Sequence, residues 1–500
     1  MRAPTHVGYL REYSDHDAAE SASGFFGRNY SILALAVLGL AAFNLTFRLG
    51  REFVSEWDES LYAMSAWEAV DKGHWLGTTF MGALDYYNTK PPLNVWLIAL
   101  SFKAFGRSLE SLRLVSVVSA WLTVAVLQYW TRRSFGPMVA LLGSLVLTTT
   151  FGFFHVHSGR SANTDALYAL LVLLTVVTLS AETRRPWLRA WLGPILAASF
   201  LLRGMAVLMP LALVLLVQVT RSRREKTSWM PTIVALVLFL APVVAWVVAR
   251  FQLDAWQFLG PMFMYDFVTA SLTPVEEHTG GPLYYLNILQ KNHYDWLLAG
   301  AVAWLLYPVP FPRVRTLLSS WRDDDGLRRL LAAWVAITLA VPTLMQTKLP
   351  WYLNTFYPVF AVGIALILAR GFSLGAGTTV ARWRLAALTT VFVLMLGVAE
   401  TKLLWYSFHY RDMSLSDQAL MLEERSRLAG HRLYQSHTDR AGTFVATAVV
   451  GAQSQDTVDL VSFLRDSRPG DYLLSADVCD AAELDVVRSN GHHYLCRRRN

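Results

Sequence analysis

The chain has 500 residues, of which 54% are apolar and 16% charged, and its mean hydropathy is +0.35. Such a chain is too long and too apolar for one soluble domain, and its apolar content excludes a disordered chain. The net charge of +7 comes from short basic clusters between apolar runs, where they can orient a chain in a bilayer, so we do not expect nucleic-acid binding.

Apolar runs along the chain predict an all-α multi-pass membrane protein. Residues 1–30 are polar and predict a cytoplasmic tail without a cleavable signal peptide, so the first apolar run should remain as an anchor. A span needs about 20 mostly apolar residues, and the candidates predict about 11–13 transmembrane helices within residues 31–405. The candidate spans are 31–48, 112–131, 137–154, 165–181, 189–203, 204–220, 230–249, 296–312, 329–346, 350–370 and 384–404.

Basic clusters set the predicted orientation. They follow alternate spans at 132–133, 184–185, 221–226, 313–315 and 382–384. Because positive charge favours the cytoplasmic side, these clusters predict outer stretches at 49–111, 155–164 and 250–295, and an outer tail from about residue 405. A crossing at 92–106 would put the clusters on alternating sides, so we interpret that segment as an interfacial or re-entrant helix.

The tail at 406–500 predicts a small extracytoplasmic α/β domain. Its pattern indicates a helix at 415–429, a β-rich run at 442–450, a helix at 456–466 and a strand at 472–474. Cys479 and Cys496 are the two cysteines of the chain. An oxidising compartment would allow them to pair if their Cα atoms lie about 4.4–6.8 Å apart.

The first two outer stretches carry closely spaced ionisable groups. Asp58 and Glu59 follow the first span, where they could supply a general base or bind a cation, although an acidic first turn of a helix is the commoner explanation for the pair alone. The second stretch contains His155, His157, Arg160, Asn163 and Asp165 within eleven residues. This density at the boundary of a span predicts a polar cavity.

Basic residues converge on the same predicted side of the membrane. Arg203 lies at the turn between two short spans, where a charge is costly without a partner or water. Lys348 and Tyr352 alone would be interfacial anchors. Together, Lys90, Arg160, Arg203 and Lys348 lie beside several carboxylates, which suits an anionic ligand held next to a base.

The order of these motifs over residues 50–360 resembles the membrane glycosyltransferases of GT-C fold, in the branch of the lipid A aminoarabinose transferase and the protein O-mannosyltransferases. The matching positions are Asp58-Glu59 with Tyr62, Lys90-Pro91, Arg160 to Asp165, Arg203-Gly204, His278 with Pro282 and Tyr284-Tyr285, and Lys348-Leu349-Pro350 with Tyr352 and Pro358. The resemblance implies a polyprenyl-phosphate sugar donor, an acceptor outside the cytoplasm that is a lipid, glycan or protein, and transfer with inversion. It also implies a bacterial inner membrane enzyme whose active site faces outward.

The resemblance further implies roles for single residues. Asp58, Glu59 and Asp165 would be catalytic, with Asp58 activating or positioning the acceptor. The lipid phosphate would be bound by Lys90, Arg160, Arg203, Lys348 and Tyr352, and the substrate loop would contain Tyr62, His278, Tyr284 and Tyr285. Thr89 and Leu61 stand where relatives of the aminoarabinose type have an acid and an arginine. This difference leaves open whether a divalent cation is bound, since Glu277 and His278 alone do not make a metal site.

Two other classes of protein fit part of the pattern. A secondary transporter also has many spans with buried charges, but its charges would lie near the midplane and its halves would repeat. A catalytically inactive binder of polyprenyl phosphates would share the charged pocket. Loss of sugar transfer with retention of the lipid, after removal of the Asp58 carboxylate, would distinguish an enzyme from such a binder.

Overall fold

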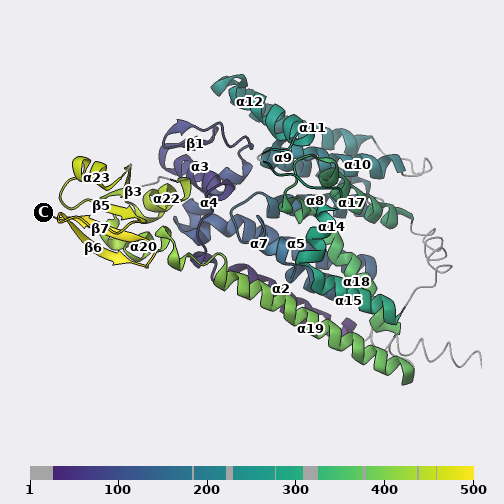
Figure 1. The fold of residues 1–500 in the computed structure, drawn as a ribbon. Helices are drawn as coiled ribbons and strands as arrows, with labels where there is room; N and C mark the ends of the chain where they lie inside the picture. Colours follow the sequence, from purple (N-terminus) through teal and green to yellow (C-terminus); the bar gives the residue numbers. More distant parts are fainter. Residues whose placement is uncertain are drawn as a thin grey trace, which may run out of the picture.

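The computed structural model describes residues 26–499 except for 183–184, 221–228, 276, 308–324, 375–378, 436–438 and 458. Most of the predicted N-terminal tail, Arg184 and the basic clusters at 221–226 and 313–315 therefore lie outside the described residues. Figure 1 shows a helical bundle at one end and a small sheet at the other, with α3 (Asp58–Lys72) between them.

The helical bundle confirms the prediction of an all-α multi-pass membrane protein. Six of the described helical segments are long and apolar enough to cross a membrane, by length and composition, and shorter apolar helices pack beside them. The helices of the bundle are α2 (Tyr30–Thr46), α5 (Leu109–Phe135), α6 (Pro137–Thr148), α7 (Phe151–His155), α8 (Asp165–Ala181), α9 (Leu192–Arg203), α10 (Leu208–Thr220), α11 (Met230–Asp254), α15 (Tyr294–Leu306), α17 (Asp325–Leu344), α18 (Tyr357–Leu374) and α19 (Thr379–His409). Most of these helices contribute buried aliphatic and aromatic side chains to one large apolar core, while α9 and α11 contribute to a second, smaller one.

Shorter elements connect these helices at the end that faces the sheet. They are the strands β1 (Thr79–Phe80) and β2 (Ala83–Leu84), and the helices α4 (Leu93–Phe105), α12 (Trp256–Phe263), α13 (Ala270–Leu272) and α14 (Tyr284–Asn292). The segment predicted at 92–106 is the helix α4, which follows Pro92 and ends at Gly106, where φ is +80°. It packs against α3, α5 and α9.

The C-terminal region forms a five-stranded mixed sheet with helices against it. Its strands are β3 (Arg432–Gln435), β4 (Gln453–Asp456), β5 (Tyr472–Ser475), β6 (Leu484–Ser489) and β7 (Tyr494–Arg498), in the order β4-β3-β5-β7-β6. Strand β3 pairs in parallel with β4 and β5, while β7 pairs antiparallel with β5 and β6. The predicted helices and strand appear as α20 (Asp417–Glu423), α21 (Arg425–Leu428), α23 (Leu460–Asp466) and β5. Cys479 and Cys496 form a disulfide with their Cα atoms 6.5 Å apart.

The prediction of a β-rich run at 442–450 is wrong. The segment forms α22 (Arg440–Phe444) followed by a π-helical turn over Val445–Val450. The side chain of Asp439 caps its start by accepting from the Gly442 amide, and Gly451, with φ +83°, ends it. Because nearly all of its residues are buried, the run of β-branched residues shows no alternation of apolar and polar side chains. The capping residues at its two ends therefore favour a helix.

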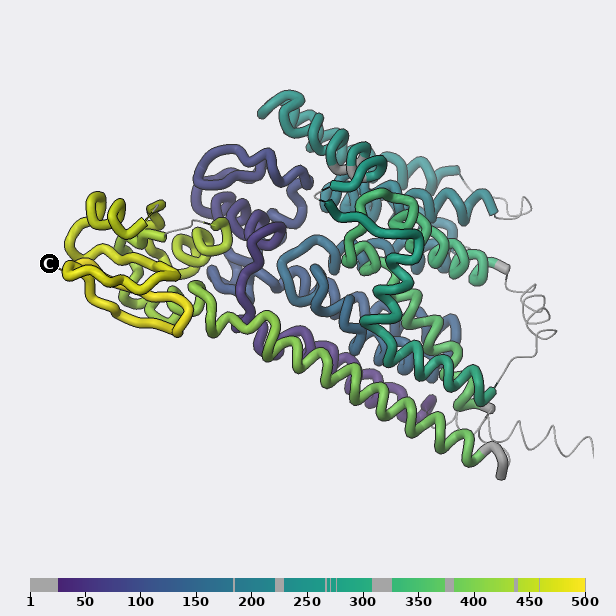
Figure 2. The backbone as a smooth tube through the Cα atoms, in the orientation of Figure 1, coloured from purple at the N-terminus to yellow at the C-terminus, as the bar shows by residue number. Residues whose placement is uncertain are grey.

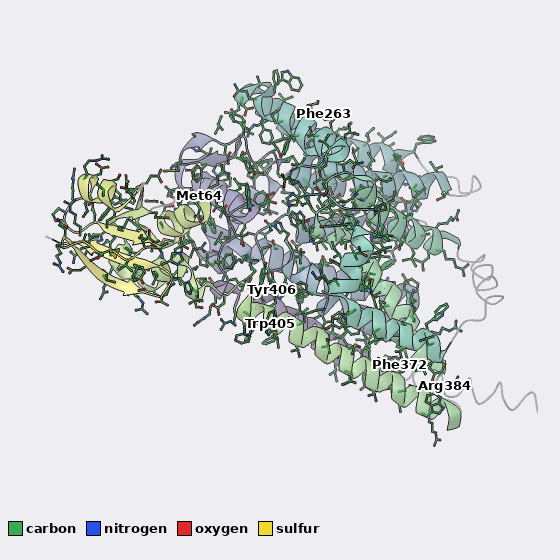
Figure 3. All side chains as sticks on the ribbon, viewed as in Figure 1. Met64, Phe263, Phe372, Arg384, Trp405 and Tyr406 are labelled. Atoms are coloured by element: carbon green, nitrogen blue, oxygen red, sulfur yellow. A yellow bond between two sulfur atoms is a disulfide. The ribbon has the colours of Figure 1, made fainter. Side chains whose placement is uncertain are left out.

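The long helix α19 relates the two ends of the bundle. Figure 3 places Arg384 at one end of this helix and Trp405 and Tyr406 at the other, nearer to Met64 of α3. In Figure 2 the chain continues from this second end into the C-terminal sheet. The basic cluster at 382–384 is thus at the opposite end of the bundle from α3 and the sheet.

Candidate active site

The first residue of α3 is Asp58, at the end of the bundle that faces the sheet. Its side chain is 44% exposed, and it lies in the first turn of the helix. The Asp58 Oδ2 atom lies 3.9 Å from Nδ1 of His157, which comes from the loop between α7 and α8.

The backbone and a stacked ring hold the His157 side chain in place beside this carboxylate, and its surroundings set its pKa. The backbone of His157 has φ +51°, in the left-handed region that residues other than glycine seldom occupy. Its ring stacks on Trp351, with ring centroids 3.8 Å apart and planes inclined by 9°. Burial lowers the pKa of His157, while the charges of Asp58 and Asp165 act in the opposite direction. The imidazole therefore favours its neutral form near pH 7, beside the Asp58 carboxylate.

An ion pair between α8 and α9 forms the second part of the site. Arg203, the last residue of α9, donates from Nη1 to Oδ1 of Asp165, the first residue of α8, over 2.6 Å. The guanidinium Cζ lies 5.3 Å from the centroid of the Tyr168 ring and interacts electrostatically with Tyr62 and Tyr352. The structure thus gathers five of the predicted site residues, Asp58, Asp165, Arg203, Tyr62 and Tyr352, around one location.

The Lys90-Pro91 motif lies against the Arg203-Gly204 turn. A Cβ atom added to Gly204 would lie 3.6 Å from Cδ of Pro91 and 3.4 Å from Sδ of Met262, and the φ of Gly204 is +55°. Glycine fits this turn because it has no Cβ to meet these neighbours and adopts positive φ readily. The turn brings the segment of Lys90 next to that of Arg203.

Glu59 and Arg160 lie in a different environment from the one predicted for them. Both side chains are fully buried. Arg160 pairs with Glu52 and donates to the carbonyl oxygens of Asn44 and Phe47. The geometry therefore gives Arg160 the role of tying the first outer loop to the loop before α8, instead of an open phosphate-binding role.

Glu59 belongs to the same buried cluster of charges. Its carboxylate accepts from Arg113 Nε over 2.8 Å and from Arg411 Nη2 over 3.0 Å. Burial alone would raise the pKa of Glu59, but Arg113 and Arg411 outweigh burial and lower this pKa well below its usual range. Glu59 is thus a permanently charged partner of two arginines, which does not suit the catalytic role predicted for it. We call Glu52, Glu59, Arg113, Arg160 and Arg411 the buried charge cluster.

Lys348 also directs its charge away from a ligand. Its ammonium donates to the carbonyl oxygens of Pro342, Thr343 and Met345 around the end of α17. Burial lowers the pKa of Lys348. In this position Lys348 caps a helix, an interaction that complements the negative end of the helix dipole.

The predicted substrate loop is attached to the segment that contains Lys348. The Lys348 amide donates to the carbonyl oxygen of His278 over 3.0 Å, while the imidazole of His278 is exposed. Tyr285 is buried, stands edge-on to Tyr284 at 5.1 Å and interacts with Tyr352. The loop therefore reaches the site through Tyr352. Among the described residues, no group of three or more His, Cys, Asp or Glu could hold a metal ion.

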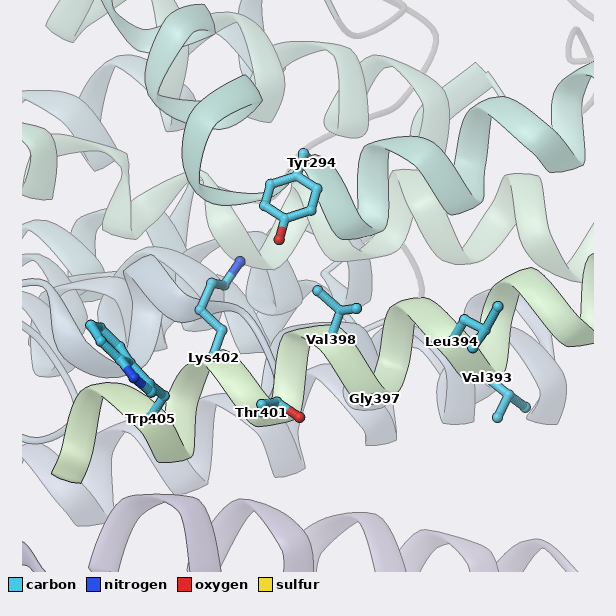
Figure 4. Close-up of a pocket in the computed structure, with 8 residues that line it drawn as sticks. All are labelled: Tyr294, Val393, Leu394, Gly397, Val398, Thr401, Lys402 and Trp405. Carbon is cyan, nitrogen blue, oxygen red and sulfur yellow. The ribbon is translucent and has the colours of Figure 1, made fainter. Parts of the chain in front are cut away.

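Two hollows mark places where ligands could enter. A hollow of about 200 Å³ is lined by Glu56, Trp57, Leu61, Tyr87 and Arg440, so the residues around the start of α3 and α22 of the C-terminal region contribute to it. A larger hollow of about 550 Å³ lies between α15 and α19; Figure 4 shows Tyr294 from α15 facing Lys402 and Val398 of α19 there. In that second hollow the Lys402 ammonium pairs with Asp295 over 2.5 Å.

Several residues of the site were not singled out by the sequence. Arg113 lies within a predicted span, where a charge could have indicated a functional or structural role. His157 was noted within its stretch but given no role, and its stack on Trp351 joins residues about 200 positions apart. Arg411 and Glu59 are separated by 352 residues, so no spacing within the sequence connects them.

Comparisons with known proteins show which proteins the chain is similar to. Residues 89–246 match the family model of dolichyl-phosphate-mannose-protein mannosyltransferases. The chain is 28% identical over 344 residues, 66% of its length, to an undecaprenyl phosphate-alpha-4-amino-4-deoxy-L-arabinose arabinosyl transferase 2 of Pseudomonas fluorescens, of which the match covers 55%. The corresponding transferase of Pseudomonas aeruginosa is 28% identical over 59% of this chain and 52% of its own length. The chain thus spans about half the length of the curated relatives it matches.

Solved structures show the fold. ArnT from Cupriavidus metallidurans bound to undecaprenyl phosphate superposes with a TM-score of 0.66 over 93% of this chain and 97% of its own, at 14% identity. The Archaeoglobus fulgidus oligosaccharyltransferase gives a TM-score of 0.52 over 84% of this chain and 63% of its own, at 12% identity. The predicted GT-C fold is therefore confirmed.

Proposed function

We propose that this protein is a membrane glycosyltransferase that moves a hexosyl or pentosyl group from a polyprenyl-phosphate donor to an acceptor outside the cytoplasm, with inversion at the anomeric carbon. The observation that carries the proposal is the arrangement of Asp58 beside the Asp165–Arg203 pair at one end of an apolar bundle. The matches to transferases that use polyprenyl phosphates support it.

Each part of the site has a role in this reaction. Asp58, which is partly exposed, accepts the proton of the acceptor hydroxyl as the hydroxyl oxygen attacks the sugar. Arg203 and Lys90, whose neighbour Pro91 lies against the Arg203-Gly204 turn, stabilise the phosphate that leaves, because its negative charge grows as the bond breaks. Asp165 holds Arg203 in position. We assign the acceptor to the hollow lined by Trp57, Tyr87 and Arg440, because Trp57 directly precedes Asp58 in the chain.

The proposed orientation places α3 and the sheet outside the cytoplasm. The basic cluster at 382–384 lies at the opposite end of the bundle, where positive charge favours the cytoplasm. The disulfide in the C-terminal region fits an oxidising compartment. Both observations support an inner membrane enzyme whose active site faces outward.

The experiment that tests the donor compares two ion pairs near opposite ends of α8. Arg203→Ala removes the pair with Asp165 at the start of α8, and Arg189→Ala removes the 2.8 Å pair with Glu182 just beyond the other end of α8. We expect undecaprenyl phosphate to raise the melting temperature of the wild type and of Arg189→Ala, each relative to its own unliganded state, but not that of Arg203→Ala. Equal responses from both variants would exclude Arg203 from the donor site. Mass spectrometry of envelope lipids and glycans, with and without the gene, would then identify the product.

A further inference from the structure

His157 is the best-placed base near Asp58 that the proposed reaction does not yet use. Its Nδ1 atom is buried, lies 3.9 Å from Asp58 Oδ2 and has no hydrogen-bond partner among the described residues. A buried ring nitrogen without a partner is costly, and such atoms in native proteins call for an explanation. Here the atom faces the carboxylate that receives the acceptor proton in the proposed mechanism.

The backbone and the stacked ring hold the imidazole in this position at a cost. A histidine with φ +51° is strained, and such strain is found preferentially at functional sites, where the surrounding structure enforces it. Trp351 covers one face of the ring and fixes its plane. The ring can therefore neither turn away from Asp58 nor move out into water without losing this stacking contact.

A negative charge near His157 stabilises its protonated form, so the imidazole can accept a proton during the reaction. The acidic groups that act on it are Asp58 and Glu59 from α3 and Asp165 from α8, and Arg411 after α19 opposes them. Glu59 is already paired with Arg113 and Arg411, and Asp165 with Arg203, so Asp58 is the carboxylate that stabilises an imidazolium here. The usual pKa of a carboxylate lies far below neutral pH, so a carboxylate is a weak base there, whereas the usual pKa of an imidazole lies close to neutral pH.

We propose that His157 is a positioning residue that orients Asp58 and takes the acceptor proton from it; this inference rests on the proposed function. The acceptor oxygen forms its bond to the anomeric carbon while the bond from that carbon to the phosphate oxygen breaks, and the phosphate leaves with the electron pair. The hydroxyl proton passes to Asp58 and then, through one bridging water, to Nδ1 of His157, because the 3.9 Å gap is too long for a direct hydrogen bond. The imidazolium, stabilised by the Asp58 carboxylate, returns the proton to solvent before the next turnover.

The experiment follows formation of the envelope product in membranes that contain the native donor and acceptor, over a range of pH. For the wild type we expect the rate to fall as pH drops through the pKa of His157, which burial holds below its usual value, because a protonated imidazole cannot accept the proton. His157→Gln should lower kcat by about tenfold to a hundredfold, leave KM for the donor within about twofold, and lose this acid limb.

Two further variants keep the test decisive. Trp351→Leu uncovers the ring and leaves both carboxylates, so the acid limb should move to higher pH. His409→Gln is the matched control, because His409 also stacks on a tryptophan, Trp405 at 4.9 Å, but is exposed at the end of α19. Its pH profile should equal that of the wild type.

The outcomes separate this inference from the proposed function. If no product depends on the gene, the proposed function fails. If product forms and His157→Gln keeps the acid limb of the wild type, or changes KM alone, the relay through His157 is refuted while the glycosyltransferase remains. If His157→Gln does not fold, an unchanged profile in Trp351→Leu overturns the inference by itself.

Discussion

Replacing Glu59 by glutamine should destabilise the whole outer end of the molecule without touching the proposed substrates. The Glu59 carboxylate accepts from Arg113, Arg411, the Ser55 amide and the Ala162 amide, so it joins three separate segments to α3. An amide of the same shape keeps one acceptor oxygen but removes the charge.

The expected magnitude follows from the charges in the buried charge cluster. Two carboxylates, Glu52 and Glu59, face three guanidinium groups, so the substitution raises the net charge of the cluster from +1 to +2. Breaking a buried pair in this way costs about 3–5 kcal/mol, because a charge is left without compensation. With an unfolding entropy of about 2 cal/mol/K per residue, a cooperative unit of 500 residues would melt about 3–5 °C lower.

The assay is thermal unfolding of the purified protein in detergent, followed by tryptophan fluorescence. Asp71→Asn is the matched control on the same helix, since Asp71 forms an exposed ion pair of 2.8 Å with Arg107. An exposed pair contributes at most about 1 kcal/mol, so the control should melt close to the wild type. If Glu59→Gln melts no lower than Asp71→Asn, the buried charge cluster does not hold the outer end together.

Three further predictions concern the C-terminal region and Lys348. Burial raises the pKa of Asp439 to about 6, so the folded state favours the protonated carboxyl. This contribution to stability is complete below the unfolded pKa of about 4 and is lost as pH rises through 6. Asp439→Asn should therefore remove that part of the pH dependence of the melting temperature. The Cys479–Cys496 disulfide closes a loop with a sequence separation of 17 and should contribute about 3 kcal/mol to stability, so its reduction should increase hydrogen exchange in β5 and β7. On intact cells, labelling of these cysteines by a membrane-impermeant thiol probe only after reduction would agree with an outer tail. Labelling only after permeabilisation would contradict an outer tail. Lys348→Ala should lower the melting temperature while undecaprenyl phosphate still stabilises the variant; loss of that stabilisation would return Lys348 to the donor site.

The sequence predicted the fold well because membrane spans depend on length, hydropathy and charge, all of which are local. The turn at Arg203-Gly204 and the helix at 92–106 were predicted for the same reason. Charged residues and glycine indicate the end of a helix from the local sequence alone, whatever the helix packs against. The run at 442–450 was predicted wrongly because a segment buried on all sides has no periodicity, and the cap by Asp439 outweighs the β propensity of its valines.

The candidate site was predictable in its location but only partly in its roles. The predicted orientation placed Asp58, Asp165 and Arg203 on the same side of the membrane, because each lies near the outer end of a predicted span. It could not separate an arginine open to a ligand from one already paired, since the partner of Arg160 is Glu52, 108 residues away. The same limit applies to Lys348, whose acceptors are carbonyl groups that the sequence does not mark.

The central claim is that Asp58 activates the acceptor of a sugar carried on a polyprenyl phosphate, and Asp58→Asn tests it most directly. The asparagine keeps the shape of the side chain but cannot take up the acceptor proton. The measurement is the rate of product formation in membranes, alongside stabilisation of the purified variant by undecaprenyl phosphate. We predict loss of transfer by at least about a hundredfold with stabilisation by the lipid retained. Transfer within about tenfold of the wild type would contradict the account and remove Asp58 from the mechanism.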